Sequence, residues 1–193
     1  MTSKPKILVF AGSAREGSLN KKLARIAARC VMEAGGEATF VDLRDFPLPL
    51  YDGDLEAREG MPPFAVKLRD MFLAHQGLLI ASPENNSSIT ALLKNTIDWL
   101  SREHRGSSGL EPYRGKVAAI MGASPGGFGT ILGLSHLRPI LTRLTVLVIP
   151  EQVLLSRAHE AFKDDGSFVD DRHLKAVTEV ARRLVETTSK VHA

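Results

Sequence analysis

The segment Gly12–Asn20 combines small residues, hydroxyl groups and one cation in a short loop that precedes a helical pattern. Small residues let the backbone turn sharply, and the helix would point its first amide groups, with their partial positive charge, at the same spot. Ser13, Ser18 and Asn20 add neutral donors. Arg15 adds a cationic donor that can form two parallel hydrogen bonds. The pattern predicts a site for a phosphate group, although an ordinary helix N-cap would also account for Ser18.

The spacing of Gly12 and Gly17 is close to that of a Walker A loop, which binds nucleoside triphosphates. That motif continues with a lysine and then a serine or threonine, whereas this chain continues with Ser18 and Leu19. Without the lysine, no charge faces the β- and γ-phosphates. The loop therefore favours a terminal monophosphate, held by neutral donors and one arginine.

A second polar loop, Ser82–Ser88, is rich in asparagine and serine. Pro83 fixes an extended turn at its start. Asparagine and serine present donors and acceptors together, which suits the edge of a polar ring that carries both N–H and C=O groups. A helix-capping turn is the alternative interpretation of this loop.

A third loop, Gly122–Gly129, fits more than one motif. Its first five residues match the G-x-S-x-G elbow of serine hydrolases, with His159 and His173 further along the chain. Pro125 follows the serine and lacks the N–H that the oxyanion hole needs, a loss of about 10²–10³ in rate. The glycines around Phe128 also resemble a dinucleotide-binding fingerprint. That fingerprint normally follows the first strand of a fold, whereas these glycines follow the fourth predicted strand. We favour a flexible, glycine-rich wall over a flat ligand.

These loops follow short, unbroken apolar runs, which are typical of strands buried on both faces of a parallel sheet. The runs predict five strands: Lys6–Ala11, Thr39–Leu43, Gly77–Ala81, Lys116–Met121 and Val146–Ile149. Apolar residues at helical spacing predict five helices: from Leu19 to Gly35-Gly36, Phe64–Ala74, Ile89–Leu100, Ile131–Leu144, and a last one with an apolar face of Leu174, Val177, Ala181, Leu184 and Val185. An irregular stretch is expected between Pro47 and Pro63.

Strands and helices alternate five times, which predicts a doubly wound α/β sandwich with helices on both faces of the sheet. Five strands suit the flavodoxin-like order 2-1-3-4-5 better than the six-stranded dinucleotide-binding fold. We expect a single domain over residues 1–193. The three polar loops follow strands one, three and four, and ligands of such sheets bind at this edge.

The composition excludes several classes of protein. The 193 residues are 44% hydrophobic and 24% charged, which excludes a disordered chain. The net charge of +3 gives little reason to expect nucleic-acid binding. The single cysteine excludes an intramolecular disulfide framework, and the six histidines show no metal-ligand spacing. No targeting or membrane-spanning segment is recognised, so we expect a cytoplasmic protein that binds no membrane.

Taken together, the loops resemble those of the NADPH-dependent FMN reductase family, whose members include chromate, quinone and azo-dye reductases. The family's first loop reads G-S-x-R-x-x-S-x-N, and this chain matches every position between Gly12 and Asn20. Its second loop reads P-E-Y-N-x-S, followed by L-K-N-x-I-D-W. The residues that match these two segments are Pro83, Glu84, Asn86, Ser88, Leu93, Lys94, Asn95, Ile97, Asp98 and Trp99. The glycines and Ser124 of Gly122–Gly129 match the third.

The resemblance implies roles for these residues. The FMN phosphate would be held by Ser13, Arg15, Ser18 and Asn20, with Leu19 beside them. The isoalloxazine ring would be bordered by Pro83, Glu84, Asn85 and Asn86. Ser124, Gly126 and Gly127 would close over it. The family usually has tyrosine where this chain has Asn85, which predicts a wider and more polar mouth beside the ring.

The resemblance further implies an FMN-dependent oxidoreductase that takes a hydride from NAD(P)H and passes electrons to a quinone, azo compound, chromate or free flavin. FMN would carry the chemistry, so no side chain need act as acid or base. The alternative is a non-enzymatic FMN-binding electron carrier, but such carriers are usually acidic. The resemblance also implies a homodimer or homotetramer. A second reason to expect one is that Trp99 projects from a different side of its helix than the apolar stripe.

Overall fold

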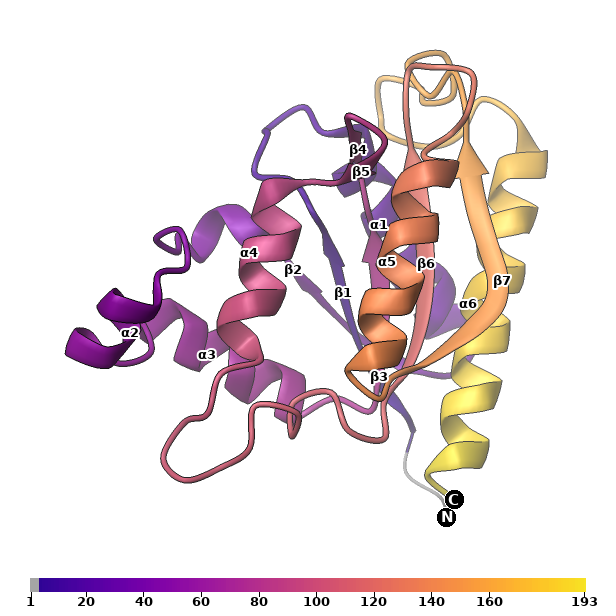
Figure 1. Cartoon of the computed structure of the whole chain (residues 1–193). Coiled ribbons are helices and arrows are strands. Elements are labelled where there is room, and N and C mark those ends of the chain that lie inside the picture. Colours follow the sequence, from indigo (N-terminus) through magenta and orange to yellow (C-terminus); the bar gives the residue numbers. More distant parts are fainter. Residues whose placement is uncertain (1–3) are drawn as a thin grey trace.

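The computed structural model describes residues 4–193. Its central feature is a five-stranded parallel sheet, with helices on both faces (Figure 1). The strands of this sheet are β1 (Lys6–Ala11), β2 (Glu37–Val41), β3 (Gly77–Ala81), β6 (Val117–Ala123) and β7 (Leu147–Leu155). Their spatial order is β2-β1-β3-β6-β7, which confirms the predicted flavodoxin-like order.

Two separate apolar cores lie on the two faces of the sheet. Helices α1 (Leu19–Glu33) and α6 (Asp171–Val191) pack together over one face. Helices α3 (Pro63–Leu73), α4 (Ala91–Leu100) and α5 (Ile131–Arg143) cover the other. Because helices bury both faces, β3 and β6 have no exposed residue, as their unbroken apolar sequences predict.

The second strand lies earlier than predicted. It covers Glu37–Val41, not Thr39–Leu43. Asp42 ends it, because its carboxylate accepts a hydrogen bond from the Arg44 N–H at 3.0 Å and starts a short 3-10 helix, η1 (Leu43–Asp45). Leu43 is still buried, which explains why the apolar run extends past the strand.

The fifth strand of the sheet is longer than predicted and continues through Pro150 to Leu155. The pairing with β6 shifts here: Ala118 lies opposite Val148, whereas Ile120 lies opposite Gln152. Proline cannot donate to a ladder, but it is tolerated at such an irregularity in an edge strand. Pro150 therefore lies within the strand, and the predicted end at Ile149 is too early.

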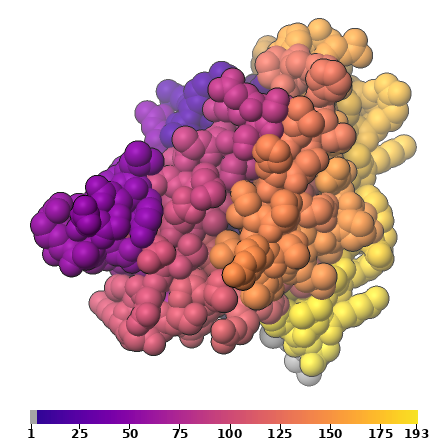
Figure 2. Space-filling view, in the orientation of Figure 1, coloured from indigo at the N-terminus to yellow at the C-terminus, as the bar shows by residue number. Residues whose placement is uncertain are grey.

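The stretch between Pro47 and Pro63 contains a helix that we did not predict, α2 (Gly53–Glu59). Asp52 caps it, accepting hydrogen bonds from Asp54 N–H at 2.8 Å and Leu55 N–H at 3.3 Å. None of its residues is buried, and the segment projects from the body in Figure 2. A helix without a buried face has no apolar periodicity to reveal it.

The third predicted helix begins two residues late, because Ile89 belongs to a small hairpin instead. Strands β4 (Glu84–Asn85) and β5 (Ser88–Ile89) form this antiparallel pair. Thr90 then caps α4, with its hydroxyl accepting from the Leu93 N–H at 3.1 Å. Ile89, Leu93 and Ile97 are spaced as on one helix face although the first lies in a strand.

Two further details concern the other helices. In α6 the predicted apolar residues are buried except Leu174, which is 42% exposed. Trp99 is fully buried inside the chain, where its indole N–H donates to the Pro49 carbonyl at 2.8 Å. The side of the helix on which Trp99 projects is therefore covered by the chain itself and needs no second copy. No helix among the described residues is long and apolar enough to cross a membrane.

Candidate functional site

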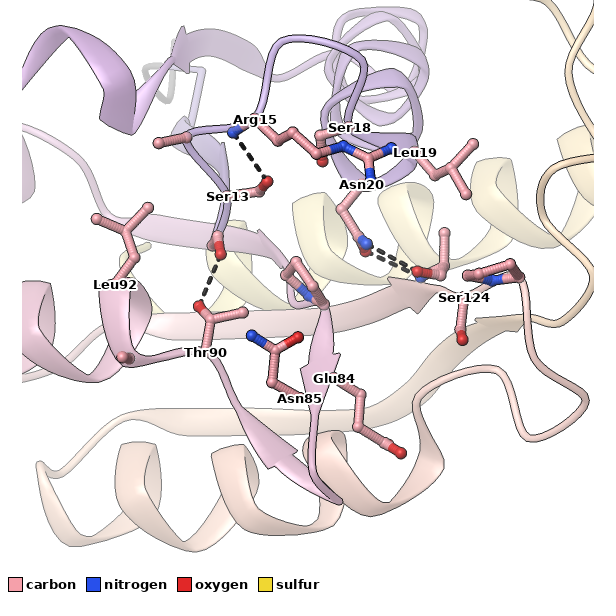
Figure 3. A pocket seen from close by; sticks show the side chains of 16 residues that line it. Ser13, Arg15, Ser18, Leu19, Asn20, Glu84, Asn85, Thr90, Leu92 and Ser124 are labelled. Carbon is pink, nitrogen blue, oxygen red and sulfur yellow. Dashed lines mark hydrogen bonds between the residues drawn. The ribbon is translucent and has the colours of Figure 1, made fainter.

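A pocket of about 630 Å³ lies at the carboxyl ends of β1, β3 and β6 (Figure 3). Its size is within the range of sites that hold cofactors and drug-sized ligands. The pocket is lined by Gly12, Ser13, Ala14, Arg15, Ser18, Leu19, Asn20, Pro83, Glu84, Asn85, Thr90, Ala91, Leu92, Ala123, Ser124 and Pro125. The three loops chosen from the sequence thus meet around one cavity.

Nine of the twelve predicted site residues line this pocket, and three do not. Asn86 occupies the turn of the β4–β5 hairpin together with Ser87, and both have positive φ, of 50° and 64°. This turn places Asn86 at the exposed hairpin tip. Gly126 and Gly127 are exposed beyond Ser124, and the Gly126 carbonyl accepts from the Arg157 N–H at 3.1 Å.

The pocket also has lining residues that the sequence analysis missed as site residues: Gly12, Ala14, Thr90, Ala91, Leu92, Ala123 and Pro125. Thr90 connects two loops of the site. Its hydroxyl donates to the Gly12 carbonyl at 2.7 Å and so ties the start of α4 to the first loop. Thr90 lies one residue into the predicted helix Ile89–Leu100, and the preference for threonine as an N-cap is the signal that could have moved the helix start to Ala91.

The first loop ends at the N-terminus of α1, where Ser18 is indeed the N-cap. Its backbone is extended and its hydroxyl accepts from the Lys21 N–H at 3.3 Å. In the described part of the chain, the N–H groups of Leu19 and Asn20 have no acceptor. A helix N-terminus with open N–H groups that lines a pocket is suited to bind an anion. Ser18 therefore fits both the helix N-cap and the phosphate site that the sequence suggested.

Arg15 is the only cation among the described residues that line the pocket. Its Nη2 donates to the Gly17 carbonyl at 3.0 Å, and its own N–H donates to Ser13 Oγ at 3.3 Å. These bonds fold the loop upon itself and keep the exposed guanidinium at the mouth. The one carboxylate of the loop, Glu16, does not line the pocket and lies 3.7 Å from Arg44.

Asn20 is buried and joins the first loop to the third. Its Nδ2 donates to the Ala123 carbonyl at 2.8 Å, and its Oδ1 accepts from the Ala123 N–H at 2.9 Å. The neighbouring Lys21 is also buried, with Nζ 2.7 Å from Asp42 Oδ1. Burial alone raises the pKa of Asp42, but hydrogen bonds from Lys21 and the Arg44 N–H outweigh it and hold the pKa below its usual value.

Glu84 lines the pocket with its backbone and stem, whereas its carboxylate turns away (Figure 3). Oε2 accepts from the Gly133 N–H at 2.8 Å, in the first turn of α5. The N-cap residue of α5, Thr130, makes no side-chain cap of its own. Glu84 therefore caps α5 from a distance. A second bond, between His136 Nδ1 and Ser88 Oγ at 3.0 Å, holds the other hairpin strand to the same helix.

The third loop does not form a hydrolase site. The Ser124 hydroxyl accepts from the Gly126 N–H at 3.1 Å and has no histidine partner among the described residues. His159 pairs instead with Glu160 at 3.2 Å. The motif's first glycine, Gly122, has a packing role, since a Cβ there would lie 1.8 Å from Thr130 Oγ1.

Neither Trp99 nor Phe128, the aromatic residues of the second and third matched segments, lines the pocket. Trp99 is buried, as described above, and Phe128 is 80% exposed beyond Ser124.

The donors that face the pocket fit the phosphate of FMN. A helix N-terminus with two open N–H groups, the hydroxyls of Ser13 and Ser18, and one guanidinium supply hydrogen bonds and a single positive charge. Apolar surface for a ring comes from Pro83, Leu92 and Pro125 on the other loops.

Comparisons with known proteins identify the same cofactor. The model of the NADPH-dependent FMN reductase family matches residues 5–160. An NAD(P)H-dependent FMN reductase of Pseudomonas aeruginosa is 36% identical over 185 residues, or 95% of each chain. A 2-hydroxy-1,4-benzoquinone reductase of a Burkholderia species is 34% identical over 182 residues, which cover 94% of this chain and 91% of that protein.

Solved structures give the same result. FerB, a flavoenzyme NAD(P)H:(acceptor) oxidoreductase from Paracoccus denitrificans, superposes with a TM-score of 0.82 at 28% identity, over 96% of this chain and 98% of that one. A flavodoxin from the domain Archaea shares the fold, with a TM-score of 0.62 at 13% identity over 95% and 98% of the chains. These matches identify an oxidoreductase with FMN as cofactor and NAD(P)H as cosubstrate, and the chain belongs to the NADPH-dependent FMN reductase family.

Proposed function

We propose that this enzyme binds FMN in the pocket at the carboxyl ends of β1, β3 and β6 and uses it to reduce quinones with NAD(P)H. The observation that carries the assignment of the pocket is the open N-terminus of α1, with Arg15 and two serine hydroxyls around it. FMN bound there would supply the two-electron chemistry that links NAD(P)H oxidation to reduction of the acceptor.

In this proposal the residues of the chain bind and orient, and none acts as an acid or base. The α1 N-terminus, Ser13 and Arg15 hold the phosphate, and the Asn20–Ala123 bonds keep that loop fixed against the end of β6. Asn86, Gly126 and Gly127 would reach a bound flavin only by a movement of the hairpin tip or of the third loop.

Quinones are favoured among the possible acceptors because relatives with similarity over most of their length are named for quinone reduction. The reaction balances without a further reductant. The quinone gains two electrons and two protons, one proton as part of the hydride and one from solvent, and NAD(P)H becomes NAD(P)⁺. Azo compounds, chromate and free flavin are the other acceptors to compare.

The proposal is tested with the purified protein in two steps. Apo-protein is titrated with FMN, and the flavin fluorescence should quench to a stoichiometry of one per chain. Steady-state NADPH oxidation is then followed with 1,4-benzoquinone, an azo dye, chromate and free FMN as acceptors. Turnover with the quinone at a higher kcat/KM than with the others is expected. FMN binding without turnover on any acceptor would instead indicate a one-electron carrier.

A further inference from the structure

One polar side chain of the pocket is left free by the protein itself. Every other polar side chain in the lining already has a hydrogen-bond partner within the chain: Ser13, Arg15, Ser18, Asn20, Glu84, Thr90 and Ser124. Among the described residues, the Asn85 carboxamide has none, although it lines the cavity. Figure 3 shows this carboxamide directed into the pocket, while Glu84 beside it is directed away.

The backbone that carries Asn85 is held firmly. Asn85 pairs with Ser88 across the β4–β5 hairpin, and the turn between them has two residues with positive φ, as in a tight type I′ turn. The hairpin is bound to α5 on both strands, by Glu84 to the Gly133 N–H and by Ser88 to His136. The carboxamide is therefore presented from a fixed frame, as a group that selects a ligand must be.

The chemistry of the free group points to a carbonyl-bearing ligand. A carboxamide offers two N–H donors and one acceptor, and it carries no charge at any ordinary pH. Asn85 is also exposed, so it lies at the open side of the cavity, where a second molecule enters after the cofactor. The phosphate donors, by contrast, come from the separate first loop.

We propose that Asn85 is a specificity-determining residue, whose Nδ2–H donates a hydrogen bond to a carbonyl oxygen of the acceptor and so favours quinones over apolar aromatic molecules. This inference rests on the proposed function, because it requires FMN to occupy the inner part of the pocket. A neutral hydrogen bond of this kind corresponds to about three- to tenfold in affinity.

The test measures binding rather than turnover. FMN-loaded protein is titrated with acetophenone and with ethylbenzene, which have similar shape but differ in the carbonyl group. No NAD(P)H is added, so neither compound can be reduced and perturbation of the flavin absorbance reports equilibrium binding. The wild type should bind acetophenone about three- to tenfold more tightly than ethylbenzene. Asn85→Asp removes both N–H donors at constant size, and Asn85→Leu removes all polar groups. Both variants should lose the preference.

Asn86→Asp is the matched control, because it makes the same change one residue further along, outside the lining, at a position where aspartate tolerates positive φ. It should keep the wild-type preference. The inference is overturned if the preference for acetophenone persists in both Asn85 variants or is absent from the wild type. In either case the proposed function still stands, provided that the protein binds FMN. The inference is also overturned if Asn85→Leu lowers the FMN affinity more than tenfold and leaves the ketone preference unchanged. That result would assign Asn85 to the flavin. Failure of the wild type to bind FMN overturns the proposed function and this inference together.

Discussion

Arg15 brings the only positive charge among the described lining residues of the pocket, and it does so from an exposed position. Its type and spacing identified it in the sequence. The direction of a side chain is harder to predict. Glu84 and Asn20 were assigned to the cofactor by resemblance, whereas their polar atoms bond to Gly133 and Ala123. Nothing in the local sequence of Glu84 indicates a capping partner 49 residues away.

Arg15→Ala should weaken FMN binding about 10–150-fold, because a hydrogen bond to a charged group contributes roughly 1.5–3 kcal/mol. Riboflavin, which has no phosphate, should bind the variant about as well as the wild type. Fluorescence titration of the apo-proteins measures both affinities. Arg44→Ala is the control, since Arg44 lies near the same loop through Glu16 but does not line the pocket. Equal losses for FMN and riboflavin would show that Arg15 shapes the loop without contacting phosphate.

At the scale of elements, the sequence predicts what is buried better than what is exposed. The central strands β1, β3 and β6 were predicted to within two residues because burial on both faces leaves an unbroken apolar run, whereas the partly exposed edge strand β2 was placed too late and β7 was ended too early. Helix α2 and the β4–β5 hairpin were missed because α2 has no fully buried residue and each hairpin strand has only two residues. The hairpin matters for the site, because its tight turn decides that Asn85 lines the pocket and Asn86 does not.

The hairpin and α5 stabilise each other through Glu84, which leads to a prediction. Glu84→Ala should lower the free energy of unfolding by about 0.5–2 kcal/mol, the usual cost of losing an N-terminal cap with its favourable charge. Glu84→Gln keeps a carbonyl oxygen for the Gly133 N–H and should lose less than half of that amount. Urea unfolding of the apo-proteins measures both. Equal losses for the two variants would mean that the charge, not the hydrogen bond, stabilises the helix.

At the scale of the whole molecule, the end of the sheet opposite the pocket contains a buried charge. Lys116 is buried, its Nζ donates to the His75 carbonyl, and desolvation lowers its pKa to about 8. Between that value and the usual 10.5, the unfolded chain binds more protons than the folded chain. The free energy of unfolding contributed by this residue therefore rises with pH over this interval, by about 3 kcal/mol.

Lys116→Met should remove this rise. The difference in unfolding free energy between wild type and variant should shift in favour of the wild type by about 3 kcal/mol between pH 7.5 and 10.5. Taking the difference cancels the titration of tyrosines and of Cys30 over the same range. Lys6→Met, which removes an exposed lysine at the start of β1, is the control. A pH-independent difference for Lys116→Met would contradict the prediction.

The predicted homodimer or homotetramer loses its support from Trp99, which packs inside the chain against Tyr51 with ring centroids 5.1 Å apart. The prediction of an oligomer now depends on the family resemblance alone. Light scattering on the FMN-loaded protein at micromolar concentration should give the mass of two or four chains. A mass of one chain would contradict it.

The paired hydrogen bonds between Asn20 and Ala123 have a consequence for deuterium exchange. They connect the loop after β1 to the end of β6 across β3, which lies between these strands. Strand ends usually fray, and their amides exchange rapidly. The Ala123 amide of the flavin-free protein should instead exchange as slowly as those in the middle of β6, and Asn20→Ala should accelerate it alone among the β6 amides. The floor of the pocket would then already be ordered before any ligand binds. FMN binding would leave the exchange rate of the Ala123 amide almost unchanged.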